Sequence, residues 1–237
     1  MKIFGKEKDK RAKIVLSLNC ESLEEVFNEI EEYKEYCDYI EWCVDTFKGS
    51  ENFTKEEFLE KINLVKRFAK PKKLIIDYKG DELIENRIIR WSMGIADIVD
   101  IDSDNTQLIR LVHEARRKQT KTLISHHIFD HMPTKDEIAE KYIRMEQNGG
   151  DIFKIAAMAK TEMETYEMLE GAAQYSRLKH AKPIVAIAMG EEGQVSRICA
   201  GDFGSILSYS CGSKTTAPGQ FNAKQLTKYM NTYYKGK

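Results

Sequence analysis

The sequence predicts an α/β protein in which residues 1–237 form a single domain, a (β/α)8 TIM barrel. Apolar runs rich in β-forming residues alternate with segments of helical period along the whole chain, and eight such runs occur. No linker rich in Pro, Gly and Ser divides them. Alternation of this kind produces parallel strands in βα units, and an eight-unit barrel takes about 250 residues. A short charged segment, residues 1–12, precedes the first strand.

The predicted strands are mostly continuous apolar runs, as expected where both faces of a parallel sheet are covered. They cover residues 14–19, 39–45, 74–79, 98–102, 122–127, 152–158, 184–189 and 205–209. An open doubly wound sheet is the alternative, and it normally has a glycine-rich turn after its first strand. Here Asn19-Cys20-Glu21-Ser22 follow that strand without a glycine, so the barrel is favoured.

Several helix boundaries can also be predicted. Thr54 with Glu57, and Thr134 with Glu137, have the spacing of a capping box at a helix start. The helix that begins after Thr54 should end before Pro71. The helix after the first strand has apolar residues at helical spacing, which should face the barrel wall. These are Leu23, Val26, Phe27, Ile30 and Tyr33.

Composition narrows the possible functions. The formal net charge is −1, and no basic stripe with interleaved aromatic residues indicates nucleic acid, so a small molecule is the expected partner. The amino terminus lacks the apolar stretch of a signal peptide, and no apolar run approaches the about 18 residues of a membrane span. The odd number of cysteines without CxxC spacing favours reduced thiols in the cytoplasm over disulfides or a zinc knuckle. They are Cys20, Cys37, Cys43, Cys199 and Cys211.

Polar residues near the carboxyl ends of the strands are the candidates for function, because a barrel places its chemistry there. Residues two apart on a strand face the same side, so Glu41 and Cys43 should point together. The polar residues that interrupt or end the predicted strands are Ser17, Glu41, Asp77, Lys79, Asp100, Asp102, His127 and Lys154.

Lys154 lies inside the sixth predicted strand, where every other residue after Asp151 is apolar. Burial disfavours the ammonium form and lowers a lysine pKa, and a neutral amine is a nucleophile for carbonyl carbon. The small Ala156 and Ala157 would leave room for a bound molecule. A lysine that extends to water, or a buried ion pair with a barrel carboxylate, fits this strand equally well.

His127 closes the fifth predicted strand, next to His126 and near His131. Three imidazoles suggest a metal site, but adjacent strand residues face opposite ways, so His126 and His127 cannot both point into the lumen. One inward histidine suits proton transfer near neutral pH, and no metal is predicted. A core histidine bonded to backbone is the alternative.

The last third of the chain contains an anion-binding pattern. A glycine-containing turn after the seventh strand leads to Arg197, and a polar loop with Thr216 and Gln220 follows the eighth. Arg197 offers a planar fork for a carboxylate, with a hydroxyl and an amide beside it. Loops after strands seven and eight of these barrels often bind anions. A surface ion pair of Arg197 and an ordinary Pro-Gly turn are the alternatives.

Six short motifs occur in order, each on an expected strand or loop. They are Ile40-Glu41-Trp42 with Asp45; Ser125, His127 and Phe129; Asp151-Ile152-Phe153-Lys154-Ile155-Ala156; Met189-Gly190 with Gly193 and Ser196-Arg197; Phe203-Gly204-Ser205; and Ala217-Pro218-Gly219-Gln220. Each motif alone is weak. Together they resemble type I 3-dehydroquinate dehydratase over essentially the whole chain.

The resemblance implies a Schiff-base lyase of the shikimate pathway that converts 3-dehydroquinate to 3-dehydroshikimate. It implies Lys154 as the nucleophile and His127 as the general acid and base. No metal or organic cofactor is implied, and the family commonly forms homodimers. Arg197, Thr216 and Gln220 would hold the substrate carboxylate. Ser17 and Glu41 would hold ring hydroxyls or orient the lysine.

Two segments depart from the family pattern. Cys43 stands where the family usually has arginine, and Lys79 is the expected substitute for a second arginine in substrate binding. Asp81 or Glu82 would replace a glutamate that supports the catalytic histidine. These departures leave two alternatives open. One is a class I aldolase-like enzyme or related lyase for another polyhydroxylated keto acid, and the other is a catalytically weak homologue that binds a metabolite.

Overall fold

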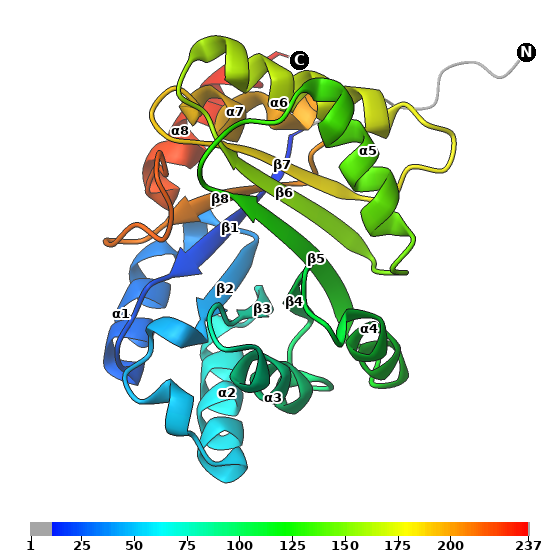
Figure 1. Ribbon diagram of the computed structural model, residues 1–237. Helices are drawn as coiled ribbons and strands as arrows, with labels where there is room; N and C mark the ends of the chain where they lie inside the picture. Colours follow the sequence, from blue (N-terminus) through cyan, green and yellow to red (C-terminus); the bar gives the residue numbers. More distant parts are fainter. Residues whose placement is uncertain (1–10, 237) are drawn as a thin grey trace, which may run out of the picture.

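The computed structural model describes residues 11–236, which form eight strands that alternate with eight α-helices (Figure 1). The strands are β1 (Lys13–Leu18), β2 (Tyr39–Cys43), β3 (Lys73–Asp77), β4 (Ile98–Asp102), β5 (Lys121–Ile128), β6 (Ile152–Met158), β7 (Ile184–Met189) and β8 (Leu207–Cys211). The helices are α1 (Leu23–Tyr33), α2 (Lys55–Ala69), α3 (Glu82–Ser92), α4 (Leu108–Arg117), α5 (Lys135–Glu146), α6 (Glu162–Ser176), α7 (Gln194–Cys199) and α8 (Ala223–Tyr233). Short 3-10 helices are η1 (Lys34–Tyr36), η2 (Val44–Thr46), η3 (Ser50–Asn52) and η4 (Ala200–Phe203).

The sheet is a nearly closed parallel barrel, which confirms the predicted fold class. Its strands lie in the order β7-β6-β5-β4-β3-β2-β1-β8. The gap between β7 and β8 is bridged at Ile184 and Ser205, and the Ile206 N–H donates to the Ile184 carbonyl at 2.8 Å. The helices surround the sheet on the outside, so the chain forms one barrel domain (Figure 1).

The barrel interior has an apolar layer below a polar one. Val15, Ile75, Ile98 and Leu123 belong to a buried cluster inside the barrel. Because strand side chains alternate faces, the residue two positions after each also points inward. Those residues are Ser17, Asp77, Asp100 and Ser125, and all four are buried. On β6 the same step leads from Ile152 to Lys154.

Most predicted boundaries agree with the structure. Residues 98–102, 152–158 and 184–189 are strands as predicted, and the helices after Thr54 and Thr134 have both bonds of a capping box. Helix α2 ends at Ala69, before Pro71. No helix within residues 11–236 has both the length and the apolar character to cross a membrane. Most of the predicted charged segment 1–12 lies outside the described residues.

Three strands differ from the prediction by two residues. The second ends at Cys43, before the predicted end at Asp45. The third ends at Asp77, so Lys79 lies in the following loop. The eighth is displaced by two residues, from 205–209 to Leu207–Cys211. Ser205 instead closes the barrel, because its hydroxyl accepts from the Ala186 N–H at 3.1 Å and donates to the Leu207 carbonyl at 2.9 Å.

Candidate active site

A cavity of about 490 Å³ opens among the carboxyl ends of the strands. Small-molecule sites commonly measure roughly 300–1,000 Å³. The eight residues that the sequence analysis selects all line it: Ser17, Glu41, Lys79, His127, Lys154, Arg197, Thr216 and Gln220. Two larger hollows lie over α4 and at the amino ends of the strands. Because barrel chemistry takes place at the carboxyl ends, the smaller cavity is the candidate active site.

Lys154 is buried in the cavity wall and is paired with acids. Its Nζ donates to Asp100 Oδ2 at 2.6 Å and lies 3.9 Å from Glu41 Oε1. Burial by itself lowers the pKa of Lys154, but the charges of Asp100, Glu41 and Asp77 outweigh it and raise the pKa above its ordinary value. The expectation of a neutral amine in apolar surroundings is therefore wrong for the protein without ligand. The alternative of a buried ion pair is what the structure contains.

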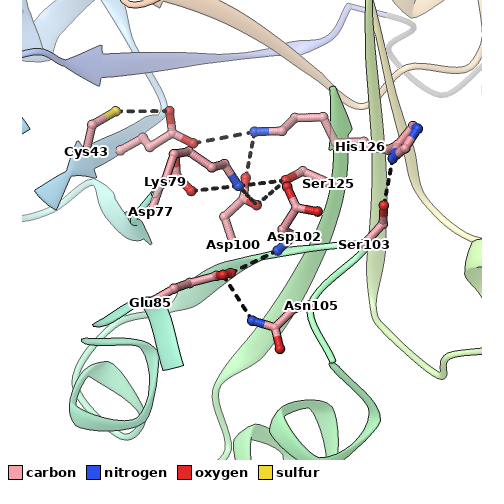
Figure 2. Close-up of polar contacts among 12 residues, drawn as sticks. Cys43, Asp77, Lys79, Glu85, Asp100, Asp102, Ser103, Asn105, Ser125 and His126 are labelled. Atoms are coloured by element: carbon pink, nitrogen blue, oxygen red, sulfur yellow. Dashed lines mark hydrogen bonds and ion pairs between the residues drawn. The ribbon is translucent and has the colours of Figure 1, made fainter. Parts of the chain in front are cut away.

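Lys79 turns into the same cavity and shares the carboxylate of Asp100 (Figure 2). Its Nζ donates to Asp100 Oδ1 at 3.2 Å and Ser125 Oγ at 3.0 Å, and lies 3.1 Å from Asp77 Oδ1. Ser125 also donates to Asp100 Oδ1 at 2.5 Å. Burial opposes both shifts, yet the mutual charges raise the pKa of Lys79 and lower that of Asp100. Asp100 is thus the common counter-charge of the two lysines.

Glu41 belongs to a second acidic group, with Cys43 and Asp77. Its Oε2 accepts from Ser17 Oγ at 2.6 Å and from Cys43 Sγ at 3.8 Å. Burial is the main cause that raises the pKa of both Glu41 and Cys43. Burial, joined by the charges of Asp100 and Glu41, raises the pKa of Asp77 to about 8.

The same group is the one place in residues 11–236 where side chains are close enough to hold a metal ion. Ligand atoms of Glu41, Cys43 and Asp77 lie within 4.8 Å of one another. Both carboxyls already face an ammonium group, at 3.1 Å for Asp77 with Lys79 and 3.9 Å for Glu41 with Lys154. A metal ion would have to compete with these two cations, so the electrostatics favour the ion pairs.

His127 faces the cavity, and His126 contacts Ser103 outside it, as strand alternation predicts. His126 Nδ1 is 2.7 Å from Ser103 Oγ, whereas the His127 ring stacks on Phe129 with 6.0 Å between centroids. Burial is the main cause that lowers the pKa of His127 to about 3, and the positive charges of Lys154 and Lys79 add to it. The imidazole is therefore neutral at pH 7, which is the form that accepts a proton.

Removal of the Lys154 charge should raise the pKa of His127. In Lys154→Met, one of the charges that disfavour the imidazolium is lost, so the His127 pKa should move from about 3 toward its ordinary 6.5. NMR titration of the histidine ring signals measures the shift. Lys224→Met, on the exposed side of α8, is the control and should leave it unchanged. An unaltered His127 pKa in Lys154→Met would contradict the electrostatic contact.

Arg197 is buried beneath the loop that follows β8. Its Nε donates to the backbone carbonyl of Gly219 at 3.0 Å, its Nη1 to the backbone carbonyl of Tyr209 at 3.2 Å and its Nη2 to that of Pro218 at 3.0 Å. Burial lowers the pKa of Arg197 to about 10, so it stays charged at pH 7. Two of these bonds hold the loop and the third reaches β8, and two of the five N–H groups of the guanidinium remain.

The loop 216–220 is also fixed by its own contacts. Gln220 Oε1 accepts from the N–H groups of Thr216 at 2.7 Å and Ala217 at 3.1 Å, and Gln220 Nε2 donates to Thr216 Oγ1 at 2.8 Å. Gly219 has φ of +72°, and a Cβ there would collide with the Gly190 carbonyl. Thr216 and Gln220 are thereby held at the cavity edge.

The expected replacements for a carboxylate that supports His127 are not supported by the structure. Asp81 caps α3 and accepts from the N–H groups of Leu83 and Ile84 at 2.9 and 3.2 Å. Glu82 accepts hydrogen bonds from Thr106. Both carboxylates are therefore engaged in holding α3 and the chain after β4.

Three residues of the cavity network received no role from the sequence. The strand patterns identify Asp77 and Asp100 only as polar residues at strand ends and assign no role to Tyr209. All three share one sequence pattern: a polar or amphipathic side chain follows, two positions later on the same strand, an apolar side chain that points inward. Leu207 before Tyr209 is an example. This alternation would have selected all three.

Comparison with known proteins gives one consistent family. The family described as type I 3-dehydroquinase matches residues 14–237. A 3-dehydroquinate dehydratase of Clostridioides difficile (strain 630) is 29% identical over 240 residues, which cover 95% of this chain and 93% of that protein. One of Listeria monocytogenes serotype 4b (strain F2365) is 30% identical over 209 residues, with 84% and 82% covered.

Solved structures agree with this relationship. A type I 3-dehydroquinate dehydratase from Clostridium difficile, described with covalently modified comenic acid, has a TM-score of 0.87 and 26% identity. The alignment covers 96% of this chain and 94% of that one. A 3-hexulose-6-phosphate synthase has a TM-score of 0.62 at 16% identity, which is a likeness of fold alone.

Proposed function

The chain belongs to the type I 3-dehydroquinase family and is an enzyme of the carbon–oxygen lyase class, and from this premise we propose that it dehydrates 3-dehydroquinate to 3-dehydroshikimate through a Schiff base on Lys154. The observation that carries the proposal is a buried lysine and a neutral imidazole in one cavity. The covalently modified ligand in the Clostridium difficile structure adds support.

Lys154 is the proposed nucleophile. Its ammonium group and the substrate ketone give an iminium ion and water, and the overall step neither gains nor loses a proton. The amine must be neutral at the moment of attack, so a proton moves temporarily to a base in the cavity. When the substrate enters, its polar groups compete for Glu41, which lines the cavity, and this weakens one of the two ion pairs that hold Lys154 charged.

His127 is the proposed acid and base. The iminium charge acidifies the neighbouring C–H bond, and the neutral imidazole takes that proton to give an enamine. The imidazolium then returns the proton to the hydroxyl on the next carbon, which leaves as water and gives a conjugated iminium. Hydrolysis releases the enone and restores Lys154. Each proton that His127 removes is thereby returned within one turnover.

Substrate binding is proposed for the remaining six predicted residues. Arg197, with its two remaining N–H donors, and the loop residues Thr216 and Gln220 would hold the carboxylate. Lys79 would add positive charge beside the ring. Glu41, which accepts a hydrogen bond from the Ser17 hydroxyl, would also accept from ring hydroxyls. We also propose, from the family resemblance, a cytoplasmic homodimer that needs no cofactor, and light scattering would test the dimer.

Turnover of 3-dehydroquinate tests the function directly. The enone product absorbs in the ultraviolet, so the wild-type protein should increase absorbance, and borohydride should trap one ligand per chain by intact mass. Trapping without enone formation would favour an aldolase-like reaction or another keto acid. If neither is observed, a metabolite-binding role without catalysis is favoured.

A further inference from the structure

Tyr209 has a buried hydroxyl group for which the fold supplies no partner. The side chain lines the cavity and is 4% exposed. Within residues 11–236, no hydrogen bond to its Oη occurs. Two other buried tyrosines differ, because Tyr142 donates to the Val185 carbonyl at 2.8 Å and Tyr175 to Glu146 at 3.0 Å. A buried polar group normally makes a hydrogen bond, so the Tyr209 hydroxyl is a candidate to bind a ligand.

Two carboxylate oxygens in the same cavity share this feature. Glu41 Oε1 and Asp77 Oδ1 are buried and make no hydrogen bond with the described residues. Each lies near an ammonium group, but the contacts at 3.9 and 3.1 Å are ion pairs without hydrogen-bond geometry. One hydroxyl and two carboxyl oxygens, from residues that line the same cavity, thus have no hydrogen-bond partner within residues 11–236.

The Tyr209 ring also lies against the proposed nucleophile. Lys154 Nζ is 4.6 Å from the ring centroid, within the range of a cation–π contact. Tyr209, Glu41 and Asp77 line the same cavity as this amine. A ligand bonded to the Tyr209 hydroxyl would therefore lie beside the Lys154 amine.

We propose that Tyr209 and Asp77 form a binding subsite for a neutral hydroxyl group of the substrate, with Tyr209 as a specificity-determining residue. The inference rests on the proposed function and adds a second hydroxyl position to the one given to Glu41. The carboxyls around the subsite would repel an anion, and Lys79 and Lys154 would repel a cation. A hydroxyl can donate to a carboxyl oxygen and accept from the tyrosine at the same time.

Tyr209→Phe tests the subsite because it removes only the hydroxyl. With 3-dehydroquinate, kcat/KM should fall about tenfold, mostly through KM, as expected for one hydrogen bond to an uncharged group. Borohydride trapping on Lys154 should stay complete at saturating substrate. Because the hydroxyl has no partner in the free protein, Tm should stay equal or rise, whereas a structural role would lower it.

Substrate analogues that lack one of the two secondary ring hydroxyls show which hydroxyl binds to Tyr209. With the analogue that lacks the hydroxyl bound here, wild type and Tyr209→Phe should have the same kcat/KM. Asp77→Asn, which keeps an acceptor and a donor, should retain more activity than Asp77→Ala. Tyr166→Phe, on the exposed side of α6, is the control and should behave as wild type.

The outcomes separate the two proposals. If the wild type turns over 3-dehydroquinate but Tyr209→Phe matches it with every ligand, or if Tyr209→Phe loses Tm, the subsite is wrong and the function stands. If the wild type neither turns over nor traps 3-dehydroquinate, the proposed function fails and the subsite fails with it.

Discussion

Lys154→Ala should abolish both the borohydride adduct and turnover of 3-dehydroquinate, with kcat reduced on the order of 10⁴- to 10⁶-fold, as for loss of other covalent nucleophiles. The reason is that the iminium that acidifies the substrate is proposed to form on the Lys154 amine. Asp100 keeps Lys79 and Ser125 as partners, so the variant should still fold. Intact mass after borohydride and the ultraviolet absorbance of the product are the two measurements, with circular dichroism to check folding.

Lys79→Ala is the matched control, because Lys79 is a second amine in the same cavity. In this variant the substrate should still be trapped on Lys154, as measured by peptide mapping. Its KM should be higher because a positive charge in the cavity is lost. If the adduct forms on Lys79 in the wild type, or survives in Lys154→Ala, the assignment of the nucleophile is wrong.

His127→Ala should separate covalent binding from the proton transfers that follow it. The adduct on Lys154 should still form, whereas turnover should fall about 10²- to 10⁴-fold, the usual contribution of a positioned acid and base. The cause is that the C–H proton has no neutral imidazole to accept it and the leaving hydroxyl has no donor. Single-turnover trapping and steady-state absorbance, measured on the same preparation, distinguish the two steps.

His126→Ala is the control for this variant. The His126 ring contacts Ser103 outside the cavity, so its loss should leave kcat within a few fold of wild type. Equal losses of trapping and turnover in His127→Ala would argue against a proton shuttle and in favour of a role in substrate binding. Turnover that is unchanged would remove His127 from the mechanism.

Local sequence was sufficient to predict the barrel. Continuous apolar runs and capping boxes are properties of adjacent residues, so 98–102, 152–158 and 184–189 could be placed correctly. Strand ends were less certain where the pattern continues beyond the sheet. The apolar run at 205–209 does not reveal that Ser205 bonds to β7 while the ladder with β1 begins at Leu207.

The sequence was sufficient to predict which residues line the candidate site, but not which contacts they make with one another. The eight selected residues line one cavity, because the carboxyl ends of parallel strands meet at one end of a barrel. Their roles remain predictions. The use of Asp81 and Glu82 as caps and loop contacts could not be foreseen, since it depends on how the chain after β3 packs.

By itself, the sequence determined the barrel, the face of each strand and the burial of Lys154 in the sixth one. Only the tertiary structure decided that this lysine is charged, because Asp100, Glu41 and Asp77 come from three other strands. An amine responds to every charge within a few ångströms, whatever the separation along the chain. Strand patterns report which residues are inside, whereas pKa values depend on which of them meet there.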